Sequence, residues 1–321
     1  MNNKHQIFII KSCLNAAPLV FLIILCFFNL CTLQAAEVTV PTSYPSHILG
    51  AISGGLGGTG LSSIDVGESY VLNPGTVAHL RDAVASFGTS SYKTSNKSLS
   101  DASTSGWHLS LNENGPESAI ATSIFISKTR NTQKRPLIFT TSSNDAWLTL
   151  GNFVMPQMSA GINYHFHDTQ TPLKTYQEHN FGIGFLWTPM DHMGVGMSFQ
   201  NINNPPKDVP DIYTLGTTYG LGLLYIHKSF IRMRLDFTKK DHALSAYSYN
   251  ETALGLETAL SEWLYSRIGA ARQVNELDEI TQKYSFGLGF AGPRFGIHYS
   301  FQQYQLSQLG QEHNLDLVIP L

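Results

Sequence analysis

The segment Tyr284-Ser285-Phe286-Gly287-Leu288-Gly289-Phe290-Ala291 decides the fold class of this chain. Large apolar residues occupy every second position, and Ser, Gly or Ala stands between them. Because side chains of a β-strand alternate between its two faces, this segment predicts a strand with one apolar face and one face of very small side chains. After the turn at Gly292-Pro293, the segment from Phe295 to Phe301 repeats the alternation, which predicts a hairpin.

The same alternation recurs from residue 82 to the end of the chain, interrupted by turn-rich stretches such as Asn112 to Pro116. We count about 13 to 15 candidate strands and expect 14, because bacterial membrane barrels have an even number. Further segments with this pattern are Ile120 to Ile126, Ala160 to Phe166, Phe181 to Trp187, Met193 to Phe199, Tyr213 to Tyr225, Ile231 to Phe237, Leu254 to Thr258 and Leu264 to Ala270.

Charge is scarce in this chain: 13% of its 321 residues are Asp, Glu, Lys or Arg, against about 25% in ordinary soluble domains. After residue 36 no apolar run approaches the roughly 20 residues of a spanning helix. Strands in lipid must close, since an unpaired edge is too costly there. The sequence therefore predicts an all-β fold, a closed antiparallel transmembrane β-barrel of about 14 strands in residues 82–321. A soluble sandwich or a lipocalin-like barrel is the alternative, because such folds also alternate.

The first 36 residues have the organisation of a secretory signal peptide. Lys4 and Lys11 precede an apolar run over residues 16–33, and the small pair Ala35-Ala36 follows it. We expect cleavage after Ala35 or Ala36 and export to the outer membrane of a Gram-negative bacterium, with a retained membrane anchor as the alternative.

All three cysteines lie within this leader, at positions 13, 26 and 31. The remainder of the chain has no thiol for a disulfide, a nucleophile or a cysteine metal site, and we predict no cofactor. Loss of Lys4 and Lys11 with the leader would change the formal charge from −3 to −5. A mildly acidic chain without a basic stripe argues against nucleic-acid binding.

The chain ends on another alternating segment, with Leu315, Leu317, Ile319 and Leu321 at every second position. A final apolar alternation resembles the assembly signal of outer-membrane proteins, although Leu321 stands where an aromatic residue is usual. We accordingly expect the barrel-assembly machinery and outer-membrane lipids as partners.

Before the strands lies a glycine-rich stretch, Gly50-Ala51-Ile52-Ser53-Gly54-Gly55-Leu56-Gly57-Gly58-Thr59-Gly60. Its glycines permit positive φ angles and close backbone approach. Further on, Asn73 is placed to cap a short helix whose first residue is Pro74 and which continues through Leu80.

This order resembles the N-terminal signature of the FadL/PorV-like outer-membrane β-barrel family, the OmpP/FadL/TodX-type transporters. There a Gly-Gly-rich stretch, an acidic spacer and Asn-Pro-Ala precede the barrel. Gly75 stands where the family usually has Ala, and Thr59 where a small apolar residue is common. The residues that carry the resemblance are Gly55, Gly58, Asp65, Asn73 and Pro74.

The resemblance implies a 14-stranded barrel whose N-terminal segment, residues 37–81, folds into the lumen as a hatch. FadL-type members take up long-chain fatty acids and other hydrophobic compounds, whereas PorV-like members bind protein cargo in type IX secretion. We expect a channel for a hydrophobic small molecule rather than an enzyme. A non-transporting barrel that binds a protein partner is the alternative, and a flexible periplasmic linker is the alternative for the glycine segment itself.

Two histidines, His165 and His167, are two residues apart on a predicted strand, so both imidazoles lie on one face and could share a metal ion. The spacing supplies no third ligand, and we therefore expect polar lumen or rim residues and no metal site. Six charged residues fall at inward or turn positions and receive no role: Arg232, Arg234, Asp236, Arg267, Arg272 and Arg294.

The sequence His298-Tyr299-Ser300 matches the His-x-Ser spacing of outer-membrane lipid hydrolases, in which imidazole activates the hydroxyl. The same spacing occurs at His108 to Ser110 and at His227 to Ser229, and the Asn-Ala-Gly continuation of lipid A deacylases is missing after Ser300. Lipid hydrolysis is therefore the least favoured of the three functions, and we assign no catalytic residue.

Overall fold

The fold is described from a computed structural model. It covers residues 50–64, 68–80, 83–94, 102–115, 118–133, 139–228, 230–305 and 310–321. The expected leader lies outside these residues, and so does Asp65 of the glycine-rich signature.

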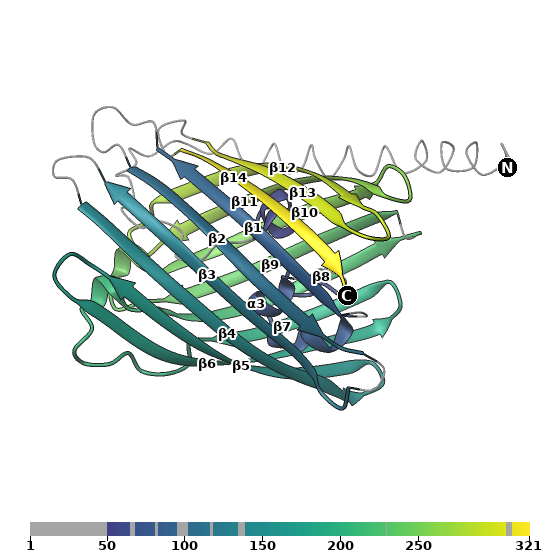
Figure 1. Cartoon of the computed structure of the whole chain (residues 1–321), viewed down its shortest axis with the longest axis horizontal. Coiled ribbons are helices and arrows are strands. Elements are labelled where there is room, and N and C mark those ends of the chain that lie inside the picture. The colour runs from purple at the N-terminus through teal and green to yellow at the C-terminus, as the bar shows by residue number, and fades with distance from the viewer. Residues whose placement is uncertain are drawn as a thin grey trace, which may run out of the picture. The chain divides into compact units, whose positions relative to one another are not determined.

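Fourteen antiparallel strands form a closed barrel, in which each strand pairs with its neighbours in sequence and β1 pairs with β14 (Figure 1). Closure confirms the predicted fold class and the predicted strand number, and it leaves no unpaired strand edge. The strands of the first half are β1 (Val84–Lys93), β2 (Ala102–Glu113), β3 (Ala121–Gln133), β4 (Phe139–Met155), β5 (Met158–Gln170), β6 (Thr175–Met190) and β7 (Met193–Gln200). Those of the second half are β8 (Thr217–His227), β9 (Ile231–Asp241), β10 (Tyr249–Ala259), β11 (Leu264–Asn275), β12 (Ile280–Ala291), β13 (Gly296–Tyr304) and β14 (Gln311–Pro320).

The alternation on which the prediction rests is visible on β12. Phe286 and Leu288 are 43% and 42% exposed on the outer face, whereas Ser285 between Tyr284 and Phe286 is 8% exposed and faces inward. The outer face is therefore apolar, as a wall in contact with lipid must be.

The start of β8 differs from the prediction. The segment expected to begin at Tyr213 begins as β8 only at Thr217, and a short 3-10 helix, η2 (Asp211–Tyr213), precedes it. The backbone N–H of Leu215 donates to Glu178 on β6 instead of joining a strand ladder. Residues 213–216 therefore lie outside the strand.

Within the described residues, helical structure is confined to short turns. These are α2 (Ala51–Gly55), α3 (Ser69–Leu72), η1 (Pro74–His79), η2 and η3 (Ser245–Tyr247). No helix in the described ranges is long and apolar enough to cross a membrane. Three of these turns, α2, α3 and η1, belong to the segment before β1.

Candidate functional site

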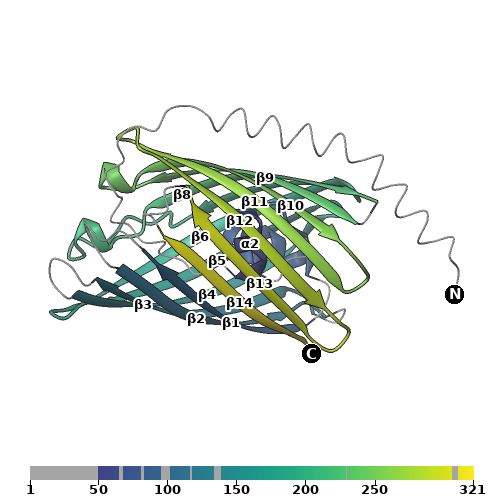
Figure 2. The same cartoon turned by 90° about the horizontal axis from the view of Figure 1, so that it is seen from above.

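The segment of residues 50–80, called the plug below, lies inside the barrel. Its first turn, α2, is seen within the ring of strands in Figure 2, and it contacts β12, β13 and β14. Its last turn, η1, contacts β4, β5 and β6. The glycine-rich segment thus folds into the lumen, and the two ends of the plug touch different parts of the wall.

Asn73 ties the plug to itself and to the wall. Its Oδ1 accepts a hydrogen bond from the N–H of Gly75 at 3.0 Å, which caps η1 as the sequence predicts. Its Nδ2 donates to the carbonyl oxygen of Leu61 at 2.6 Å and to that of Phe185, on β6, at 3.0 Å. One buried amide side chain therefore joins three segments, and only its capping role could be read from the sequence.

Carboxylates of the wall hold the other end of the plug. Oδ2 of Asp236, on β9, accepts from the N–H groups of Gly60 at 2.7 Å and Leu61 at 3.0 Å. Oδ2 of Asp316, on β14, accepts from the N–H of Ala51 at 2.5 Å. Both acceptors are buried, so these hydrogen bonds anchor the first half of the plug to the wall.

Glycines of the inner wall make room for the plug. A Cβ added to Gly161 would lie 2.3 Å from the carbonyl oxygen of Pro74, and one added to Gly184 would lie 2.0 Å from Oδ1 of Asn73. No side chain fits at such distances. The plug therefore packs against the inward face of small residues that the sequence predicts. The other wall glycines that a plug atom approaches within 3.2 Å of the added Cβ are Gly151, Gly194, Gly196, Gly220, Gly222, Gly255, Gly269 and Gly287.

The signature residues are distributed along the plug. Gly55 ends α2 and packs on the backbone of Gly287, and Gly58 adopts a positive φ of 93°, which favours glycine. Pro74 begins η1, the turn that Asn73 caps. A gating role for these residues stays a prediction.

Gly75 departs from the usual Ala of the signature, and its surroundings give a reason. A Cβ at this position would lie 2.9 Å from the Cα and the carbonyl carbon of Phe185 on β6. An alanine here would push η1 away from the wall. Glycine in place of the usual alanine therefore allows η1 to approach β6 closely.

An apolar cluster fills the space between η1 and the wall. Tyr70, Val77 and Leu80 of the plug pack with Ala121, Phe125 and Trp147 of β3 and β4. The expectation of a purely small or polar inner face is wrong here, because Phe125 and Trp147 point inward. The sequence carried the signal: Phe125 stands between Ile124 and Ile126, and three large apolar residues in a row cannot all face outward.

Aromatic rings continue this cluster along the inner wall. The ring of His108 stacks on Phe125 with centroids 5.3 Å apart, and Phe125 meets Trp147 edge to face, also at 5.3 Å. Trp147 stacks on His165 at 3.9 Å with an interplanar angle of 10°. The row runs across β2, β3, β4 and β5 and ends at the two histidines found in the sequence.

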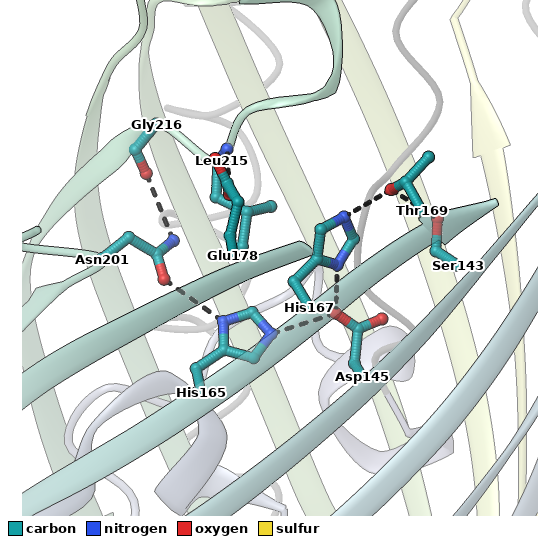
Figure 3. A network of polar contacts seen from close by, with 9 residues as sticks. All are labelled: Ser143, Asp145, His165, His167, Thr169, Glu178, Asn201, Leu215 and Gly216. Atoms are coloured by element: carbon teal, nitrogen blue, oxygen red, sulfur yellow. Dashed lines mark hydrogen bonds and ion pairs between the residues drawn. The ribbon is translucent and has the colours of Figure 1, made fainter. Parts of the chain in front are cut away.

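His165 and His167 do share the inner face of β5, and a third residue joins them (Figure 3). Oδ1 of Asp145, on β4, lies 3.0 Å from Nε2 of His165 and 2.6 Å from Nδ1 of His167. All three side chains are buried. Asp145 was missed because only the strand register, which pairs it with His167, brings it to the site.

A separate ionic cluster lies on β9, β10 and β11, in the second half of the sequence. Glu257 accepts from Nη1 of Arg232 and from Nε of Arg267, each at 2.6 Å. Arg234 is buried on the inner face as well, so these inward positions agree with the prediction. Arg272 is exposed on β11 rather than inward, and Arg294 is exposed in the turn before β13.

The His-x-Ser sequences are engaged in other contacts. Nδ1 of His298 lies 3.3 Å from Nη1 of Arg267, and Oγ of Ser300 accepts from Asn314 beneath Gly54 of the plug. Oγ of Ser110 lies 2.5 Å from Oγ of Ser86. Ser229 lies outside the described residues. The best hydrolase candidate, Ser300, is thus covered by the plug.

No known protein family model matches the sequence, and no curated protein matches it closely enough to be counted as a relative. Solved structures do match. CymD, a monoaromatic hydrocarbon channel, superimposes with a TM-score of 0.69 at 10% identity, over 85% of this chain and 97% of CymD. A Pseudomonas aeruginosa FadL homologue gives 0.63 at 11% identity, over 84% and 98%. The toluene transporter TodX of Pseudomonas putida gives 0.62 at 11% identity, over 85% and 98%. The chain therefore has the FadL-like outer-membrane barrel fold.

Proposed function

We propose that this chain is an outer-membrane channel for hydrophobic small molecules, in which the plug must move for a solute to pass. The observation that carries the proposal is the apolar cluster between η1 and the wall. Tyr70, Val77 and Leu80 bury their side chains against Phe125 and Trp147, and an apolar solute can replace such contacts because they are not directional.

The similar structures support the substrate class. Two of them are described as a monoaromatic hydrocarbon channel and a toluene transporter, and a third as a FadL homologue. We propose an aromatic hydrocarbon or a long-chain fatty acid as the solute. The neighbours are channels, so an enzymatic function is not part of this proposal.

The remaining expectations belong to the same proposal. Residues 1–36 would act as a cleaved export signal, residues 37–81 as the hatch and residues 82–321 as the barrel. Lipids of the outer membrane would surround the apolar outer face, and the barrel-assembly machinery would insert it through the strand that ends the chain. Gly55, Gly58, Asp65, Asn73 and Pro74 would serve the hatch.

Uptake by whole cells tests the function. Cells lacking their own hydrophobic-compound channel would express this chain, and entry of radiolabelled toluene and oleate would be compared with entry of a small sugar. We expect faster entry of at least one hydrophobic compound and unchanged entry of the sugar. Hydrophobic uptake equal to that of cells without the chain, with the barrel present in the outer membrane, would contradict transport and favour the protein-binding alternative.

A further inference from the structure

The group of Asp145, His165 and His167 has the composition of a metal centre. Their possible ligand atoms, one from each residue, all lie within 4.8 Å of one another. Among the described residues, no other group of three or more His, Cys, Asp or Glu side chains meets this condition. Two imidazole nitrogens and one carboxylate oxygen are a ligand set typical of zinc, with three protein ligands and one open position. None of the contacts that hold the plug uses these residues.

The distances suit coordination. Ligand atoms of a tetrahedral zinc site lie about 3.3 Å apart when each bond is about 2.0 Å. Oδ1 of Asp145 is 3.0 Å from Nε2 of His165 and 2.6 Å from Nδ1 of His167. Shifts of a few tenths of an ångström would separate these atoms enough to place an ion between them.

The outer nitrogens of both histidines are already matched to oxygen atoms. Nε2 of His167 lies 2.8 Å from Oγ1 of Thr169, and Nδ1 of His165 lies 3.3 Å from Oδ1 of Asn201 (Figure 3). Metal-bound histidines usually donate their second N–H to such an oxygen, which fixes the ring and its tautomer. Each imidazole therefore turns the correct nitrogen toward Asp145.

The site is buried, and one oxygen of its carboxylate lacks a contact. Trp147 stacks on the ring of His165, and Asp145 is 1% exposed. Oδ2 of Asp145 has no hydrogen-bond partner among the described residues, although an unpaired buried oxygen is costly. A bound cation would offset the charge of this carboxylate.

We propose that Asp145, His165 and His167 bind a divalent transition metal ion, with zinc as the fitting case. The site would fasten the β7–β8 connection, residues 201–216, to the inner wall. Asn201 contacts His165 and donates to the carbonyl oxygen of Gly216, while Leu215 donates to Glu178, the neighbour of His167 across β5 and β6. The ion would thus add a link between this connection and the inner wall.

Zinc titration of the purified chain tests the proposal. The protein would carry no histidine tag, would be stripped with a chelator and would be titrated with zinc chloride in a calorimeter. We expect one zinc ion per chain and an affinity at least tenfold lower in Asp145→Asn and in His167→Asn. Thr169→Val should lower the affinity about tenfold, because it removes only the outer contact of His167.

Controls separate coordination from surface binding and from misfolding. His179→Asn removes an exposed histidine of β6 and should leave the affinity unchanged. Every variant should keep the heat-modifiable gel migration of a folded barrel. Cobalt in place of zinc should give intense visible absorption bands, which tetrahedral coordination produces and adventitious binding does not. No saturable zinc binding by the unmodified chain, or equal affinity in folded Asp145→Asn, would overturn the proposal and leave a hydrogen-bonded triad.

Discussion

The two ends of the plug differ in the contacts that hold them. At the η1 end, Val77 and Leu80 lie in an apolar cluster with Phe125 and Trp147 of the wall, in addition to hydrogen bonds such as that from Oγ of Ser159 to the carbonyl oxygen of Gly75 at 2.7 Å. At the α2 end, the backbone N–H of Ala51 donates to the carboxylate of Asp316, and Oγ of Ser285 donates to the carbonyl oxygen of Gly55 at 3.1 Å.

This difference indicates which end a hydrophobic solute would release. Apolar contacts depend on buried area and can be exchanged for contacts with a solute, whereas hydrogen bonds to a buried carboxylate have no apolar substitute. We therefore expect the η1 end to open while the α2 end stays attached.

Trp147→Ala should have the largest effect, because it removes the biggest ring of the cluster. Truncation of a buried Trp costs about 3–5 kcal/mol. Here it should weaken the binding of the η1 end to the wall. Hydrogen exchange of residues 74–80 should become much faster, while residues 51–55 keep their protection. Trp107→Ala, on the outer face of β2 and 39% exposed, is the control. Equal acceleration at both ends in Trp147→Ala would show that the plug moves as one body.

Asn73→Ala should have the next largest effect. Loss of the cap costs about 0.5–2 kcal/mol, and the carbonyl oxygens of Leu61 and Phe185 lose their donor as well. Asn73→Ser separates the two contributions, since Ser offers a capping oxygen and lacks the donating NH₂. Limited proteolysis within the plug should be fastest in Asn73→Ala and intermediate in Asn73→Ser. Identical rates in the two variants would mean that the cap contributes nothing.

Asp236→Asn should have a smaller and more local effect. The substituted side chain still offers one oxygen to Gly60 and Leu61 but loses its charge, and charged acceptors contribute roughly 1 kcal/mol more than neutral ones. Exchange at residues 60 and 61 should accelerate, with residues 74–80 unaffected. Acceleration at residues 74–80 would break the distinction between the two ends.

A change of pH should produce the smallest effect, of opposite sign at the two ends. Burial lowers the pKa of His79, in η1, to about 4, so the stability of this end is full above about pH 6.5 and is lost as the pH falls toward 4. Burial raises the pKa of Glu68, which accepts from the N–H of Ser53, so that end loses stability as the pH rises above about 4.5. Between pH 7 and 5, acid should lower the exchange protection factor, measured against the intrinsic rate at each pH, near His79 and raise it near Ser53. The same sign at both ends would contradict this assignment.

The sequence predicted the elements that depend on local pattern. Alternation on segments such as Tyr284 to Ala291 predicted the barrel wall, and Asn73-Pro74 predicted a capped turn that is found as η1. It did not predict contacts that depend on register. Asp145 meets His167, and Trp147 meets His165, only because β4 and β5 pair with the offset that they have. Asp236 and Asp316 were visible as strand residues, but nothing local indicates that a plug N–H reaches them.

Cross-linking the plug to the wall tests the central claim most directly. A Cβ added to Gly255, on β10, would lie 2.9 Å from Cβ of Leu56, so a small outward shift gives the separation of about 3.8 Å found in a disulfide. The chain has no cysteine after residue 31, so Leu56→Cys with Gly255→Cys introduces the one possible pair outside the leader.

Uptake of the hydrophobic solute would be measured before and after reduction of this disulfide, with each single-cysteine variant as a control. If passage needs the whole plug to leave, oxidation should stop uptake and reduction should restore it. If only the η1 end opens, as the account predicts, uptake should persist with α2 cross-linked. It should stop when Val77→Cys is instead cross-linked to Gly151→Cys, where the added Cβ lies 2.5 Å from a methyl carbon of Val77. Undiminished uptake with the η1 end cross-linked would contradict a moving plug.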